Sequence, residues 1–404
     1  DYVFSFKINS DISSKMKLMI TSTMGKSYNV PINQNDQQFW NLTFGINGTN
    51  VWNPTDFMRT PLQIAAVTNE QRPSRIFSNS WYSQSEVSHF TFAAKLTNFL
   101  SASTYYEASF EHVSRDYLTG PVRNRDLTKR YEIAPGYFVD EAPYGYDPNP
   151  DADLAGMFFG GHSSTARDSS DIQSYVLKGD LTSQLNKHHL VKTGIEFSYY
   201  NLNLDYGLLN VYFGDVNWVK EKWNPYRLSM YAQDKIEALG FIANIGVRLD
   251  LSNPNTDWVN VDPFNKGYYS TSYSTDSSYA REKAKVDVAF SPRLGISHPI
   301  TENSKLYFNY GHFKELPAYE EIFRLGRGSA GSMRNNGNPN LEQARTISYE
   351  LGYDHVIATD YLIQLAAFYH DITSQQGFTQ YLSDRKGIGY FAANNNNYRD
   401  IRGF

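Results

Sequence analysis

Apolar and polar side chains alternate in segment after segment of this 404-residue chain. Around Leu306, Phe308 and Tyr310 the apolar residues fall on one face, because successive residues of a β-strand point to opposite sides. The same alternation recurs in the segments 2–8, 16–21, 90–96, 106–111, 174–181, 191–199, 227–237, 240–251, 286–296, 346–354 and 361–369. The pattern therefore predicts roughly twelve full strands and the start of another at Tyr398.

The connections between these segments are of two lengths. Tight turns are expected at 9–14, 97–101, 184–189 and 357–360, and another contains Pro299. Long excursions are expected at 25–86, 114–170, 205–224, 252–283 and 314–343, the last with a short helix from Pro317 to Arg324. Loops longer than about fifteen residues are uncommon in compact domains. The alternation of short and long connections gathers the long loops at one end of the strands.

Two folds produce such alternation, a soluble sandwich and a transmembrane β-barrel. Strands of about ten residues exceed the roughly five or six of globular proteins. Charges recur on the polar faces, at Lys17, Lys95, Glu107, Glu111, Lys178, Asp180, Lys192, Glu196, Arg248, Asp250, Asp287, Arg293 and Glu350. A lipid-facing apolar band, a polar lumen, short periplasmic turns and long extracellular loops are the properties of a membrane barrel. We therefore expect an all-β fold, an antiparallel transmembrane β-barrel.

Composition agrees with this class and excludes others. The chain has no cysteine, a formal net charge of −5 and 15% aromatic residues. Without cysteine there is no disulfide framework or thiolate metal site, and the mildly acidic balance argues against nucleic acid as a partner. The mean hydropathy is −0.52, because lumen and loop residues together outweigh the lipid-facing half of the strands.

Two segments that membrane and secreted proteins often carry are not visible in the sequence. No run approaches the roughly 18 apolar residues of a membrane-spanning helix; the best, Leu362–Phe368, contains Gln364. No signal peptide is visible at Asp1, where the first residues already alternate as a strand. The sequence is therefore expected to be either a processed chain or a piece of a longer one.

Several motifs resemble one known family. Leu306–Phe323 (LYFNYGHFKELPAYEEIF), then Gly337–Glu342 (GNPNLE) and Thr346–Gly352 (TISYELG), resemble the C-terminal half of the barrel in TonB-dependent outer-membrane receptors. Further similar motifs are VKTGIEF at 191–197, YAQD at 231–234, IGVRLD at 245–250, FYHDI at 368–372 and YRDIRGF at 398–404. Their style is closest to receptors of Bacteroidota. One departure is Gln343-Ala344, where the family usually has Pro-Glu.

The resemblance implies an architecture and a location. Such receptors have a barrel of twenty-two strands, an N-terminal plug domain within it and a preceding segment that contacts TonB. Residues 1–404 are then part of a single barrel domain, with the plug and the C-terminal strands absent from this chain and Phe404 inside a strand. The implied location is the outer membrane of a Gram-negative bacterium. The implied partners are outer-membrane lipid, the TonB complex and a nutrient.

The residues give no support to an enzyme, a metal site or a cofactor. His188 and His189 lie in an expected periplasmic turn, without a second pair to complete a metal site. Asp147, Asp151 and Asp153 could offer oxygen ligands to calcium, yet they lack the glycine and final glutamate of an EF-hand. We therefore expect no catalytic residues, no resident metal and no cofactor.

Binding is better supported than catalysis. Aromatic side chains on outer loops can stack on sugars or chelate rings. The alternative is that they pack the loops together or line the membrane edge. The candidates are Tyr137, Phe138, Tyr144, Tyr146, Tyr268 and Tyr269.

Four charged residues are candidates for contacts in the lumen. Charges on the inner face of a plugged barrel pair with the plug or with neighbouring strands, or they contact the substrate directly. These candidates are Arg248, Asp250, Asp287 and Arg293.

Three functions remain open at this point. The first is active, TonB-dependent uptake of a scarce nutrient such as a siderophore, cobalamin, a glycan or a peptide. The second is a passive or gated porin, and the third is a surface adhesin or structural protein. The fold alone does not choose among substrates.

Overall fold

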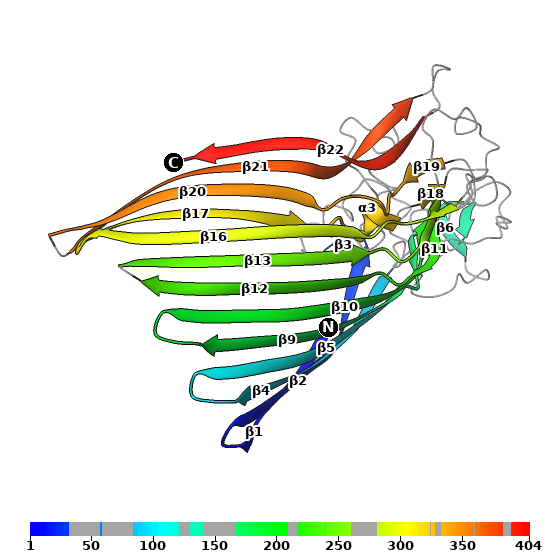
Figure 1. The fold of residues 1–404 in the computed structure, drawn as a ribbon. Helices are drawn as coiled ribbons and strands as arrows, with labels where there is room; N and C mark the ends of the chain where they lie inside the picture. Colours follow the sequence, from blue (N-terminus) through cyan, green and yellow to red (C-terminus); the bar gives the residue numbers. More distant parts are fainter. Residues whose placement is uncertain are drawn as a thin grey trace.

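In a computed structural model, the chain forms one large, curved, antiparallel sheet (Figure 1). The structure describes residues 1–31, 57–58, 84–120, 130–140, 166–208, 216–238, 240–259, 281–323, 325–327, 333–358, 360–382 and 389–404. Its long strands within these ranges are β1 (Tyr2–Ser13), β2 (Met16–Pro31), β4 (Gln84–Phe99), β5 (Thr104–Gly120), β9 (Asp171–Gln184), β10 (His189–Leu208), β12 (Tyr226–Ala238), β13 (Phe241–Asn253), β16 (Asp287–Thr301), β17 (Ser304–Glu315), β20 (Ala344–Ile357), β21 (Tyr361–Leu382) and β22 (Gly389–Gly403). Each long strand pairs with the next one along the chain.

The two ends of the sheet differ. Tight turns join the strands at one end, whereas the short elements gather at the other end (Figure 1). These are β3 (Phe57–Met58), β6 (Arg130–Ala134), β7 (Tyr137–Asp140), β8 (Ala166–Asp168), β11 (Val216–Trp223), β14 (Asp257–Val259), β15 (Arg281–Lys283), β18 (Leu325–Arg327), β19 (Met333–Asn336) and the single helix turn α3 (Tyr319–Phe323). Within the described ranges, no helix has the length and apolarity needed to cross a membrane. The predicted all-β, antiparallel class and the predicted asymmetry of connections are confirmed.

The two faces of the sheet follow the alternation of the sequence. On β10, Ile195 is 49% exposed and points outward, whereas Glu196 and the buried Ser198 point to the opposite face. That opposite face also carries Leu202, against which α3 packs. The polar face is therefore the inner face, and the apolar side chains form the outer face that a barrel presents to lipid.

Aromatic rings line the outer face in a band, which we call the outer aromatic belt. His112 stacks on Tyr175 with centroids 4.5 Å apart, and Tyr175 lies 6.5 Å from Tyr199. The second half of the belt crosses three more strands, with Tyr310, Tyr349 and Tyr369 spaced 5.2 and 6.3 Å apart. Such rings suit the interface between hydrocarbon and headgroups, where one side of the ring is apolar and the other wet.

Several predicted boundaries were wrong. Pro299 lies inside β16, opposite Lys305 and beside a register shift, a place where a strand tolerates the missing N–H. The segment 205–224, predicted as a loop, contains the end of β10 and the returning β11. The last strand begins at Gly389, not at Tyr398. At the rim one face need not meet lipid, so alternation is no longer required in β11 or at the start of β22.

Candidate functional site

Most inner-face charges are matched by neighbours on the wall itself. Lys95 pairs with Glu107 at 2.7 Å across β4 and β5, and Lys305 pairs with Asp354 at 3.0 Å across β17 and β20. The Tyr231 hydroxyl donates a hydrogen bond to Asp180 Oδ1 at 2.6 Å, spanning β10 between them. These links hold the strands in register and match the charges of the residues that they join.

Arg248 and Asp250 are neighbours on the inner face of β13. The Arg248 Nε donates to both Asp250 oxygens, at 2.8 and 3.0 Å. The Ser229 hydroxyl also donates to Asp250 Oδ1 at 2.6 Å. The structure thus brings together two of the four lumen residues that the sequence predicted.

A hollow opens in the inner wall beside Arg248, with a volume of about 590 Å³. Glycines create it, because Gly246 on β13, Gly295 on β16 and Gly311 on β17 present no side chains. We call it the wall hollow. Its polar lining comes from the residues Tyr231, Gln233, Asn244, Arg248, Arg293, Asn309, Ser348 and Glu350.

Arg293 is exposed at the centre of the wall hollow. In the sheet register it stands between Gly246 on one side and Gly311 on the other. Its guanidinium lies over the Phe313 ring, 4.7 Å from the centroid. Within the described part of the chain it makes no ion pair. A cation supported on a ring and flanked by glycines is open to a group that enters the lumen.

Glu350 stands on the far side of the wall hollow. It accepts a hydrogen bond from the Tyr307 hydroxyl at 3.2 Å and one from Asn309 Nδ2 at 3.5 Å. The wall hollow therefore presents a positive group in its middle and a negative group at its edge.

Asp287, the fourth predicted lumen residue, lies apart from the wall hollow. It stands at the outer end of β16, where its Oδ2 accepts a hydrogen bond from the Gln343 N–H at 3.2 Å. This hydrogen bond holds the start of β20 against β16, so the contact that Asp287 makes here is a structural one.

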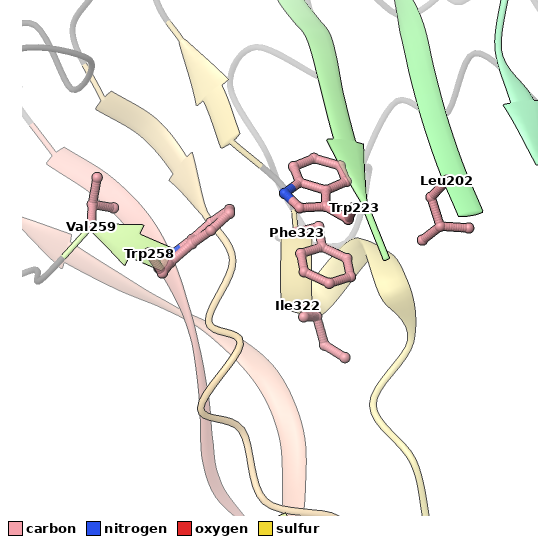
Figure 2. Packing of buried hydrophobic residues seen from close by; sticks show 6 residues of the cluster. All are labelled: Leu202, Trp223, Trp258, Val259, Ile322 and Phe323. Atoms are coloured by element: carbon pink, nitrogen blue, oxygen red, sulfur yellow. The ribbon is translucent and has the colours of Figure 1, made fainter. Parts of the chain in front are cut away.

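Toward the rim from the wall hollow, the inner face carries a packed group of apolar residues that we call the rim platform: Leu202, Trp223, Trp258, Val259, Ile322 and Phe323 (Figure 2). Trp223 and Phe323 stack with centroids 4.6 Å apart and planes 9° apart. The Trp258 Nε1–H donates to the Gly337 carbonyl at 3.0 Å. Because these rings are buried, they hold α3 on the sheet and are not free to stack on a ligand.

A second aromatic contact joins α3 to the sheet next to the rim platform. The Arg227 guanidinium lies 5.3 Å from the ring centroids of both Tyr200 and Tyr319, and these two rings pack edge to face with centroids 5.5 Å apart. Burial raises the pKa of the Tyr319 hydroxyl, so it stays protonated at any physiological pH. The cation and two rings anchor the first residue of α3.

The Gly337–Glu342 segment ties α3, β21, β22 and the connection before β16 together at the rim. The Asn338 N–H donates to the Glu321 carbonyl of α3 at 2.8 Å, and Asn340 Oδ1 accepts from the Lys285 N–H at 2.7 Å. The Glu342 carbonyl accepts from Asn395 Nδ2 of β22 and from Gln376 Nε2 of β21, both at 2.9 Å. The Gly337–Glu342 motif therefore has a structural role, since its hydrogen bonds hold the segments of the rim together.

Asp168 is a buried carboxylate at the rim. It is 2% exposed, and its Oδ1 accepts from the Ser170 N–H at 2.9 Å. Burial raises the pKa of Asp168 to about 6, against the lowering effect of its hydrogen bonds with Ser170.

Of the six aromatic residues predicted as outer-loop contacts, two lie in a described strand and four lie outside the described residues. Tyr137 and Phe138 belong to β7, which forms a separate hairpin with β6. Tyr144, Tyr146, Tyr268 and Tyr269 lie outside the described residues, as do Asp147, Asp151 and Asp153. Their binding roles stay predictions.

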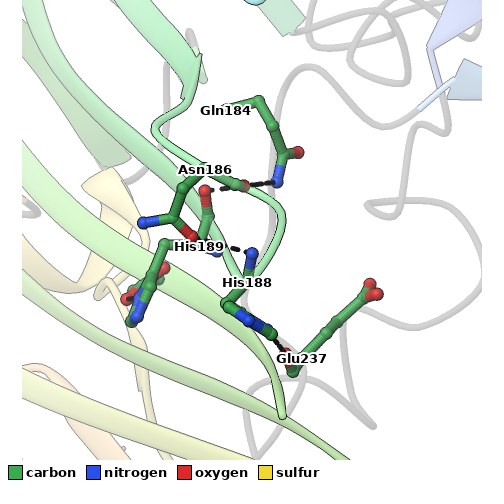
Figure 3. A network of polar contacts seen from close by, with 6 residues as sticks. Gln184, Asn186, His188, His189 and Glu237 are labelled. Atoms are coloured by element: carbon green, nitrogen blue, oxygen red, sulfur yellow. Dashed lines mark hydrogen bonds and ion pairs between the residues drawn. The ribbon is translucent and has the colours of Figure 1, made fainter.

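The paired histidines lie at the tight turn between β9 and β10: His188 is in the turn, as predicted, whereas His189 is the first residue of β10 (Figure 3). The His188 Nδ1–H donates to the Glu237 carbonyl at 2.6 Å, and the His189 Nδ1 lies 2.6 Å from Asp234 Oδ2. Among the described residues, no three His, Asp or Glu side chains converge on a metal position. The histidines join this turn to β12.

Sequence reasoning missed the wall hollow and the rim platform. The wall hollow depends on strand register, which sets Arg293 between two glycines of other strands. One signal for the platform was available, since Tyr319 and Phe323 are four apart and share a face of the expected helix.

Comparison with protein families gives one match, the family described as TonB dependent receptor-like, beta-barrel, over residues 21–404. Comparison with curated protein sequences gives no match.

Solved structures with the same fold include the siderophore receptor PirA from Pseudomonas aeruginosa, at 12% identity and a TM-score of 0.56. The match covers 99% of this chain and 52% of PirA. The FrpB iron transporter from Neisseria meningitidis in its apoprotein form matches at 10% identity and 0.54, over 99% and 48%. The copper transporter OprC matches at 12% and 0.52, over 99% and 48%. The chain thus spans about half the length of these structures.

Proposed function

The chain belongs to the family of TonB-dependent receptor β-barrels, and we propose that the whole protein takes up a scarce nutrient across the outer membrane with energy delivered through TonB. Proteins of this family lie in the outer membrane of Gram-negative bacteria and are transporters, not enzymes. The observation that carries the proposal is the family match over residues 21–404. An origin in Bacteroidota stays a prediction from the motifs.

The inner face supplies a path and a docking wall for this function. Arg293 and Glu350 offer one charge of each sign in the wall hollow, while Arg248 and Asp250 satisfy each other beside it. A plug domain within the lumen would meet this wall, and its displacement would expose Arg293 to a passing nutrient. Tight turns then face the periplasm and the rim platform faces outward.

The substrate class is the least constrained part of the proposal. The named structural neighbours include a siderophore receptor, an iron transporter and a copper transporter. At their level of identity they support the fold, so siderophore, cobalamin, glycan and peptide all stay open. Tyr137, Phe138, Tyr144, Tyr146, Tyr268 and Tyr269 are our proposed outer contacts.

Uptake measured in three strains tests the proposal. The wild type, a strain lacking the complete receptor gene and a strain lacking TonB are grown in one defined medium, and the depletion of each nutrient is followed. We expect at least one nutrient that only the wild type depletes. A nutrient that disappears with the receptor gene but not with TonB would instead identify a passive porin. A protein that high salt extracts from membranes without detergent would be an adhesin or a surface structural protein.

A further inference from the structure

Two cations face each other on the outer side of the sheet. Lys314 on β17 and Arg345 on β20 are directly opposite in the antiparallel register. Both lie on the outer face, because Lys314 is four residues from Tyr310 and Arg345 is four residues from Tyr349 on strands of period two. Like charges directly opposite each other destabilise a sheet. An anion bound beside Lys314 and Arg345 would offset this repulsion.

The described part of the chain does not supply that anion. Neither Lys314 nor Arg345 makes an ion pair there. On β21, Arg345 faces the neutral Thr373. The nearest outward carboxylate in the register is Asp371, which stands opposite Ile347 and diagonal to Arg345, and no ion pair joins it to Arg345 in the described residues. Asp371 faces Asp400, which accepts hydrogen bonds from the Tyr369 and Tyr398 hydroxyls.

The position of the pair suggests the source of the anion. Lys314 and Arg345 stand four residues beyond the Tyr310–Tyr349 pair of the outer aromatic belt, toward the rim. Four residues are about 13 Å along a strand, or roughly 10 Å along the membrane normal at the usual tilt. Because the belt marks the edge of the hydrocarbon, the two cations lie at the level of lipid headgroups.

We propose that Lys314 and Arg345 bind the phosphate of an outer-leaflet lipid headgroup. Both side chains are half-buried, so their stems lie along the apolar outer face and their charged ends reach the headgroup layer. Arg345 offers two N–H groups in a fork and Lys314 a compact charge, which together suit the oxygens of one phosphate. His312 extends the surface one step toward the belt, with its Nε2 2.6 Å from the Tyr310 hydroxyl.

Lipid binding to the full-length receptor tests this inference. Purified receptor in detergent is titrated with bis-phosphorylated lipid A, with the same lipid after dephosphorylation, and with inorganic phosphate, and binding is read by native mass spectrometry and thermal unfolding. The variant carries Lys314→Gln and Arg345→Gln. The control carries Lys15→Gln and Lys187→Gln, which remove the same charge from the tight-turn end.

We expect the bis-phosphorylated lipid to bind the wild type and the control alike and to bind the variant roughly tenfold more weakly. The variant should fold, since it removes a repulsive pair, and Lys314→Arg should keep full binding. Equal binding to variant and wild type, or equal binding of the dephosphorylated lipid, would overturn the inference. So would inorganic phosphate that protects the receptor as well as the lipid does.

Discussion

The inner face of one sheet is used in two ways along its length. At the rim it is covered, because Trp223, Trp258 and Phe323 pack α3 onto the strands. Farther down it is open, because the residues opposite Arg293 on the two neighbouring strands are glycines, Gly246 and Gly311. The same polar face thus carries a closed, packed structure at the rim and an open surface farther down, which under the proposed function would lie on the path of the nutrient.

Removing a ring from the rim platform should have the largest effect. Phe323 is 2% exposed, and Phe323→Ala should cost about 3 to 5 kcal/mol of local stability by leaving a cavity beside Trp223. Hydrogen exchange of α3 and of the Gly337–Glu342 segment measures this in the full-length receptor. The control Phe308→Ala removes an outward ring that is 36% exposed and should leave that exchange unchanged. Unchanged exchange in Phe323→Ala would show that the rim platform does not hold the loop.

The pH dependence of the rim follows from Asp168. Its pKa of about 6 in the fold lies above the ordinary 3.8, so the folded state binds more protons between these values and stability falls as the pH rises through that window. Asp168→Asn removes the buried charge and should stabilise the rim at pH 7, by at most about 3 kcal/mol. The measurement is hydrogen exchange of the Ser170 amide between pH 4 and pH 8. A wild-type rim whose stability is flat over this range would contradict the prediction.

Filling the wall hollow should reduce transport without unfolding the barrel. A Cβ at Gly311 would meet the Phe313 ring at 3.1 Å and Arg293 Cγ at 3.6 Å. Gly311→Val should therefore displace Arg293 and lower uptake by the full-length receptor about tenfold, about 1.4 kcal/mol in the barrier. Gly179→Val is the matched control, since a Cβ there meets Ile195 at 3.7 Å on the outer face. Equal uptake by the two variants would show that the nutrient does not pass the wall hollow.

Removing only the positive charge of Arg293 should have the smallest effect on uptake. Arg293→Gln keeps most of the side-chain volume and removes the cation, and it should lower uptake by a few-fold while leaving thermal stability unchanged. Lys7→Gln, an exposed inner-face cation on β1, is the control. A loss of stability in Arg293→Gln with no change in uptake would make the residue a structural one.

The sequence predicts the sheet better than it predicts the rim platform or the wall hollow. Between lipid and lumen the two faces of a strand meet different solvents, so alternation at Ile195 and Glu196 shows both the strand and its orientation. At the rim this constraint ends, so the sequence predicts a loop at 205–224, where the structure has β11. The wall hollow cannot be predicted from the sequence for another reason: it depends on which residues of β13, β16 and β17 stand side by side.

The most direct test of an open wall within a gated lumen is thiol labelling in living cells. Residues 1–404 contain no cysteine, so Ser348→Cys adds one thiol to this part of the receptor, in the wall hollow, and Lys285→Cys adds one on the exposed rim. A membrane-impermeant thiol reagent is added to cells with and without TonB. We predict that Ser348→Cys reacts several-fold faster in energised cells that contain TonB, whereas Lys285→Cys reacts at one rate in both. Labelling of Ser348→Cys at the same rate with and without TonB would contradict the account.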